Sequence, residues 1–85
     1  LPEDTALDNK TKELVGLSVA SHIKCQYCTH FHSRTSEAFG ANDQEIREAI
    51  AMGGLTDFWS NCLSGTQQDF STFQKDVNKM IEALS

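Results

Sequence analysis

Apolar side chains recur every three or four residues along most of this 85-residue chain, which is the spacing of an α-helix that buries one face. The spacing is clearest near the end, where the apolar positions are Phe70, Phe73, Val77, Met80, Ile81 and Leu84. The only proline is Pro2, so no proline interrupts a helix further along the chain. No segment has the alternating pattern of a β-strand. The sequence therefore predicts an all-α fold.

Two helices are expected in the first half of the chain, joined by a short reversal. Asp8 is suited to cap the first of them. Apolar residues cover most of the circumference of residues 13–23, which predicts that this helix is buried on several sides. The second helix runs from about residue 24 or 25 to about residue 39, where Gly40 provides a stop.

The second half of the chain has a clear helix start and a weak point. Asn42, with Glu45 three residues later, is the pattern of a helix N-terminus. The adjacent glycines Gly53 and Gly54 are expected to weaken the helix that follows, and to bend or split it. The helical spacing resumes after them until Gly65, and a last helix follows. We expect the segments to form a bundle of antiparallel helices joined by short turns.

The acidic composition argues against two classes of partner. The formal net charge is −5 at pH 7 and no basic run is present, which disfavours binding to nucleic acid or to anionic membrane surfaces. No apolar run approaches the roughly 20 residues that a membrane-spanning helix needs. We therefore expect a protein that binds neither nucleic acid nor a membrane.

Chain length and cysteine content indicate the domain organisation and the compartment. Residues 1–85 are enough for a single domain with a small core, and the apolar helix faces left over from such a core favour self-association. A start at Leu1 rather than Met is compatible with the loss of N-terminal residues. Three cysteines, two of them in a C-x-x-C pair, fit an intracellular redox or metal site better than a secreted disulfide scaffold. We expect a cytoplasmic location.

Cys25 and Cys28 are the main candidates for chemistry. Cysteines three residues apart on a helix share one face and are close enough to form a disulfide. Such a disulfide closes a very small loop and contributes little crosslinking entropy, which favours reversible redox chemistry over a structural role. Cys25 also lies near the expected start of a helix, where unpaired amides and the helix dipole stabilise a thiolate.

Two further residues are candidates for moving protons. His32 follows Cys28 by four residues, so the two side chains are neighbours and the imidazole can take a proton from the thiol. If the chain reverses near residues 23–24, the first two helices run antiparallel and Glu13 faces His32 to within roughly 3 Å along the helix axis. The sequence therefore predicts a relay in which Glu13 sets the tautomer of His32 beside the two cysteines.

Other interpretations of these residues stay open. The C-x-x-C pair could be two buried small residues, and a structural zinc site usually needs four thiolate or imidazole ligands. The candidate zinc ligands are Cys25, Cys28, either His30 or His32, and Cys62. His22 and His30 are more typical of surface residues, and Cys62, beside Phe58 and Trp59, is more typical of a buried apolar residue. We expect neither a metal nor a cofactor.

The residues of the relay occur together with two further sequence features. The run LDNKTKEL at residues 7–14 contains Glu13, and Gly40-Ala41 follows the motif Cys25-x-x-Cys28-x-x-x-His32. Over about residues 7–50 this combination resembles the carboxymuconolactone decarboxylase / AhpD-like superfamily. Members that act as plain decarboxylases usually lack the cysteine pair, so the pair favours the alkylhydroperoxidase-like branch.

The resemblance implies a fold, an assembly and a mechanism. The fold is one AhpD-like antiparallel helical bundle over residues 1–85, assembled into a homotrimer or homohexamer. The activity is a thiol-dependent peroxidase that reduces hydroperoxides, with Cys28 as the peroxidatic thiol and Cys25 as the resolving thiol that forms a disulfide with it. His32 is then the base next to Cys28, and Glu13 is the group behind His32. An external dithiol or a protein reductant restores the pair.

One position departs from the pattern of the resemblance. Tyr27 stands between the cysteines where AhpD carries a histidine, and a tyrosine does not shuttle protons near neutral pH. A general disulfide reductase is also compatible with the residues, as is a decarboxylase or lactone-processing enzyme in which the cysteines are incidental. Arg34 and Arg47 are the only arginines and form no evident clamp for a substrate carboxylate. The redox interpretation therefore ranks first.

Overall fold

The all-α fold expected from the sequence is confirmed. The computed structural model describes residues 5–85, and these contain helices and turns but no strand. The helices are α1 (Asn9–Ile23), α2 (Gln26–Ala38), α3 (Asp43–Gly65) and α4 (Phe70–Leu84). In the described part of the chain, no helix is long and apolar enough to cross a membrane.

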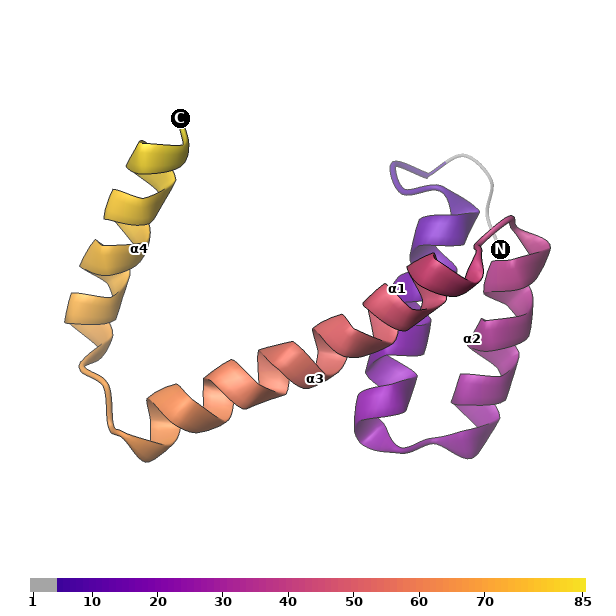
Figure 1. The fold of residues 1–85 in the computed structure, drawn as a ribbon, viewed down its shortest axis with the longest axis horizontal. Helices are drawn as coiled ribbons and strands as arrows, with labels where there is room; N and C mark the ends of the chain where they lie inside the picture. Colours follow the sequence, from indigo (N-terminus) through magenta and orange to yellow (C-terminus); the bar gives the residue numbers. More distant parts are fainter. Residues whose placement is uncertain (1–4) are drawn as a thin grey trace.

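The first two helices form an antiparallel hairpin (Figure 1). Only Lys24 and Cys25 connect them, and Lys24 makes the reversal by adopting a left-handed conformation with φ 61°. The backbone N–H groups of both residues donate to the carbonyl oxygen of Ala20, the second at 3.1 Å. These bonds use a carbonyl that the end of α1 would otherwise leave unpaired, and they hold Cys25 at the start of α2.

The core of this hairpin is small and partly polar. Among the described residues, the buried hydrophobic side chains are Leu17 and Ala20, both on α1. Glu13 of α1 and Ser36 of α2 are buried with them. Ser36 is satisfied locally, because its hydroxyl donates to the carbonyl of Ser33 at 2.9 Å. Glu13, by contrast, has its hydrogen-bond partner, His32, on α2.

Side-chain caps define where α1 and α3 begin, as the sequence predicts. The carboxylate of Asp8 accepts from the N–H of Thr11 at 2.7 Å. At the start of α3, Asn42 accepts from the N–H of Glu45 at 2.8 Å while the Glu45 carboxylate accepts from the N–H of Asn42 at 3.0 Å. Glu45 also pairs with Lys10 at 2.9 Å, which joins the first turns of α1 and α3. Such caps stabilise a helix by about 1 kcal/mol each.

The break expected at Gly53 and Gly54 is wrong, because α3 runs through both glycines without interruption. Gly53 is required by packing. A Cβ at this position would lie 2.8 Å from the carbonyl oxygen of Ser18 and 2.9 Å from its hydroxyl, so the missing side chain lets α1 and α3 approach closely. A Cβ on Gly54 would meet nothing within 4 Å. The pair therefore contains one packing glycine and one that faces open space.

We predict opposite effects for alanine at these two positions. Gly53→Ala should lower the free energy of unfolding by about 1–3 kcal/mol, because the new methyl group forces the backbone of α1 away. Gly54→Ala should raise it by up to about 1 kcal/mol, because alanine favours a helix more than glycine does. Urea unfolding followed by circular dichroism measures both. Equal effects of the two substitutions would contradict the close α1–α3 contact at Gly53.

The fourth helix lies apart from the hairpin. α1 packs against both α2 and α3, whereas α3 extends well beyond this contact and places α4 at its far end (Figure 1). With 23 residues, α3 is about 35 Å long. The bundle predicted from the sequence therefore includes α1, α2 and the first half of α3, and α4 is not packed on it.

Candidate functional site

The two cysteines of the C-x-x-C motif meet at the start of α2. Cys25 is the N-cap of this helix, and its sulfur accepts from the backbone N–H of Cys28 at 3.2 Å. The two Sγ atoms lie 2.6 Å apart, and both residues are free cysteines. Both are partly exposed. The short connection after α1 therefore brings two thiols into direct contact at a point that solvent can reach.

The two thiols differ in acidity. A hydrogen bond from the Cys28 thiol, followed by that from the Cys28 backbone N–H, lowers the pKa of Cys25 below its ordinary value. Sharing its proton with the Cys25 sulfur, together with burial, raises the pKa of Cys28. Cys25 is therefore the first of the two thiols to lose its proton, as its place at the helix start predicts. If Cys28 is the attacking thiol, as the resemblance implies, its pKa is expected to be the lower of the two. The structure gives the reverse order.

Glu13 and His32 form the contact expected from two antiparallel helices. The Nδ1 atom of His32 on α2 lies 2.6 Å from Oε2 of Glu13 on α1. The Glu13 carboxylate is only 2% exposed, and among residues 5–85 its other oxygen, Oε1, has no hydrogen-bond partner. A buried carboxylate paired at Nδ1 selects the imidazole tautomer whose Nε2 carries no proton. The pair thus presents His32 as a base on the side of the ring away from Glu13.

Gly16 makes room for the imidazole and was not identified from the sequence. A Cβ at Gly16 would lie 2.6–2.8 Å from three atoms of the His32 ring, so the ring occupies the space of the missing side chain. The ring of Phe31 also contacts His32 edge to face, with ring centroids 5.2 Å apart. The available signal was a glycine inside an otherwise good helix, since such a glycine costs about 1 kcal/mol relative to alanine.

The two pairs are close in sequence but are not joined by a hydrogen bond. Within residues 5–85, nothing links His32 to either cysteine, although His32 and Cys28 are one turn apart on α2. An open hollow of about 630 Å³ lies beside Cys25 instead. Its other lining residues are polar: Ser21, Lys24, Gln26, Thr29, His30 and Ser33. A reagent from solvent therefore reaches Cys25 through a polar surface.

The remaining candidate residues lie elsewhere. Cys62 is on the far part of α3, and Tyr27 is 80% exposed. His22 lies 3.9 Å from Asp57, between α1 and α3. In the part of the chain that the structure describes, no three His, Cys, Asp or Glu side chains form a group that could hold a metal ion. The groups that the structure brings together are two thiols and a carboxylate–imidazole pair.

We predict that the acidity of Cys25 depends on the Cys28 thiol. Cys28→Ala removes the donor that stabilises the Cys25 thiolate, so the pKa of Cys25 should rise and its alkylation by iodoacetamide should need a higher pH. Part of the effect should remain, because the backbone N–H still donates to the sulfur. Mass spectrometry of the alkylated peptide over a pH series measures this. The control is Cys62→Ser, which should leave the pH profile of Cys25 alkylation unchanged. If Cys28→Ala also leaves this profile unchanged, the two sulfurs do not share a proton.

We also predict that Gly16→Ala displaces His32. The new methyl group overlaps the imidazole, so the contact with Glu13 should be lost at a cost of about 1–3 kcal/mol in the free energy of unfolding. Nitrogen chemical shifts of the His32 ring report the tautomer, which should become mixed. Gly54→Ala is the matched control, since its Cβ meets no other atom. If the His32 ring keeps its native tautomer in Gly16→Ala, the contact between Glu13 and His32 does not depend on the space left by Gly16.

Comparison with known proteins adds a family and one relative. The sequence model of the Carboxymuconolactone decarboxylase family matches residues 2–67. The chain is 38% identical over 47 residues to "Uncharacterized protein 4 in cox locus" of Paracoccus denitrificans. This match covers 55% of the chain and 42% of the relative, so the chain spans less than half of that protein. No solved structure matches the chain.

Proposed function

The chain belongs to the carboxymuconolactone decarboxylase family, and from this premise we propose that it is a thiol-dependent oxidoreductase that reduces hydroperoxides. The family includes enzymes. One observation carries the proposal: two free thiols lie 2.6 Å apart, on the same helix as a histidine oriented by a buried carboxylate. A pair of thiols at this distance can pass between the dithiol and disulfide forms with little movement of the backbone.

The reaction has three balanced steps. A cysteine thiolate attacks the terminal oxygen of R–O–O–H, so that a sulfur–oxygen bond forms, the oxygen–oxygen bond breaks, and the departing alkoxide takes a proton to become an alcohol. The second thiol then attacks the sulfenic acid, a disulfide forms and water leaves. Two electrons have passed from the two thiols to the peroxide. An external dithiol reduces the disulfide by thiol–disulfide exchange and is itself oxidised.

Cys28 is the attacking thiol in this proposal, and Cys25 resolves the intermediate. The lower pKa of Cys25 alone would favour the opposite order, so the assignment follows the family resemblance and requires a proton shared between the two sulfurs to move from Cys28 to Cys25, which leaves the thiolate on Cys28. His32 supplies the proton that the alkoxide needs or takes one from Cys28, and Glu13 holds its ring in the required tautomer. Each of the four residues then has a distinct role in moving either electrons or protons.

The proposal predicts how cysteine variants consume peroxide. With cumene hydroperoxide as oxidant and dithiothreitol as reductant, the wild-type chain should turn over and Cys28→Ser should fall to the background rate. Cys25→Ser should still form a sulfenic acid on Cys28, which dimedone traps and mass spectrometry locates. His32→Ala should lower the rate by roughly 100-fold, as is usual for loss of a general acid or base.

Cys62→Ser is the matched control, because it removes a thiol that lies outside the pair. Its peroxide consumption should equal that of the wild-type chain. Activity that survives in Cys28→Ser would sink the proposal. A dimedone label on Cys25 in Cys28→Ser, with no label on Cys28 in Cys25→Ser, would reverse the two cysteine roles and keep the rest of the proposal.

A second candidate function is a general disulfide reductase. It is favoured by the acidity of Cys25 and by the polar hollow beside it, since exchange with a disulfide begins with an exposed thiolate. The reduction of insulin disulfides in the absence of peroxide distinguishes it from a peroxidase. A decarboxylase or lactone-processing activity, by contrast, should survive the loss of both thiols.

A further inference from the structure

The hollow beside Cys25 has a lining whose charge is opposite to that of the chain as a whole. The chain contains 12 Asp and Glu residues against 7 Lys and Arg residues. The lining of the hollow, by contrast, contains Lys24 and His30 but no carboxylate. An acidic protein repels anions over most of its surface, so a basic hollow is where an anion would collect. The lining therefore favours a negatively charged ligand next to a reactive thiol.

Most of the polar side chains of this hollow have no partner in the described part of the protein. Ser21 is the exception, since its hydroxyl donates to the carbonyl of Leu17 at 2.9 Å. Within residues 5–85, no side-chain hydrogen bond or ion pair is found for the other polar lining residues: Lys24, Gln26, Thr29, His30 and Ser33. Each of these side chains has at least one N–H or O–H donor. A carboxylate, whose two oxygens accept several hydrogen bonds, matches this set of free donors.

Lys24 occupies a backbone position that suits glycine better than lysine. Its φ of 61° and ψ of 38° are left-handed, and this conformation ends α1 and starts the reversal into α2. Glycine is the usual residue at such a helix end, because a side chain in the left-handed region comes too close to the following carbonyl group. The lysine therefore carries a backbone cost that the turn itself does not require. What the lysine adds is an ammonium group that lines the hollow.

The position of the hollow indicates which reactant it would receive. Cys25 lines it and Cys28 does not. In the reaction proposed above, the peroxide meets Cys28, so the reactant that meets Cys25 is the donor that reduces the disulfide. A volume of about 630 Å³ is within the range of sites that hold small molecules. Acidity alone would direct the donor to Cys28, because Cys25, with its lowered pKa, would be the better leaving group. The hollow directs the donor to Cys25, because access also decides which sulfur is attacked.

We propose that this hollow binds the electron donor, and that the donor is a small thiol compound that carries a carboxylate. The inference rests on the proposed function in one respect, namely that Cys25 and Cys28 form a disulfide. The donor thiolate attacks Sγ of Cys25, so that a donor–Cys25 disulfide forms, the Cys25–Cys28 disulfide breaks, and Cys28 leaves as a thiolate that takes up the proton the donor released. A second donor thiolate, from the same molecule or another, then attacks the donor sulfur. The donor disulfide leaves, Cys25 returns as a thiolate, and two electrons have passed from two donor thiols to the pair.

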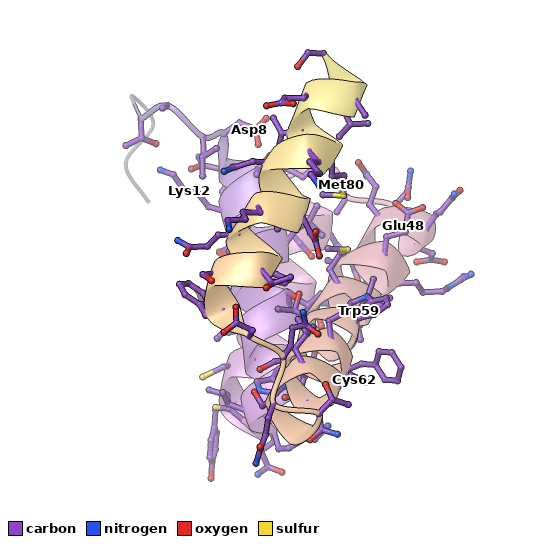
Figure 2. All side chains as sticks on the ribbon, turned by 90° about the vertical axis from the view of Figure 1, so that its left-hand side faces the viewer. Asp8, Lys12, Glu48, Trp59, Cys62 and Met80 are labelled. Atoms are coloured by element: carbon purple, nitrogen blue, oxygen red, sulfur yellow. The ribbon has the colours of Figure 1, made fainter. Side chains whose placement is uncertain are left out.

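The reduction of the disulfide form by two matched thiols tests the proposal without peroxide. Diamide converts the pair to a disulfide, and Cys62, labelled in Figure 2 on α3, is replaced by serine in every sample so that only the pair reacts. The donors are β-mercaptopropionate and its amide, which differ only in the carboxylate. Each rate is divided by the rate of the same thiol with hydroxyethyl disulfide, a neutral disulfide, which removes the difference in intrinsic reactivity between the two thiols.

The variants of this experiment test the role of the Lys24 ammonium. With the parent chain, β-mercaptopropionate should react about three to five times faster than its amide after this correction, as expected for one exposed ion pair. Lys24→Gln should remove most of this preference and leave the rate with the amide unchanged. Lys24→Gly should do the same without straining the turn, because glycine adopts the left-handed backbone freely. Lys79→Gln is the matched control: it removes the same charge from α4, which lies at the far end of α3 (Figure 1), and should keep the preference.

Several outcomes would overturn the inference. Acid quenching, alkylation and mass spectrometry locate the mixed disulfide, which should be on Cys25 with Cys28 alkylated; a mixed disulfide on Cys28 would overturn the attack at Cys25. Equal corrected rates for the two thiols would overturn the choice of a carboxylate. The same preference in Lys24→Gln as in Lys79→Gln would mean that the carboxylate does not bind in the hollow.

Two further outcomes separate this inference from the proposed function. A pair that diamide does not convert to a disulfide would overturn both. A chain that shows the expected preference but does not consume peroxide would support the donor site and overturn only the peroxidase function.

Discussion

The two-residue reversal between α1 and α2 determines most of what this molecule can do. It places Glu13 and His32 side by side across the hairpin, and it makes Cys25 the N-cap of α2. A longer turn would change the register of the two helices and separate the carboxylate from the imidazole, because each residue along a helix adds about 1.5 Å. The left-handed backbone at Lys24 makes this short connection possible.

Glycines control how closely the helices around this hairpin approach. Gly16 leaves space for the His32 ring, and Gly53 leaves space for the backbone of α1. Both lie inside helices, where glycine is unfavourable by itself, so each exchanges local helix stability for a tertiary contact. The buried Glu13, one oxygen of which is unpaired within the described part of the chain, has a similar cost. Unfavourable features of this kind are common where a structure serves chemistry as well as stability.

The two thiols and His32 are arranged in order along α2. The thiols lie at the exposed start of the helix, and His32 lies one turn further, against the buried carboxylate. In the proposed reaction, electron transfer would occur where a reagent can arrive, and the carboxylate–imidazole pair would lie in the drier interior, where its electrostatic interaction is stronger.

The sequence alone predicts the all-α class, the bounds of α1 and α2 within a residue or two, the caps at Asp8 and Asn42, and the pairing of Glu13 with His32. These are decided by local patterns and by counting along two antiparallel helices. Only the tertiary structure decides the rest. Whether Gly53 breaks a helix or lets one approach depends on the Ser18 backbone beside it. Whether an apolar stripe on α4 is buried depends on where a long, straight α3 carries it, and no spacing within the stripe contains that information.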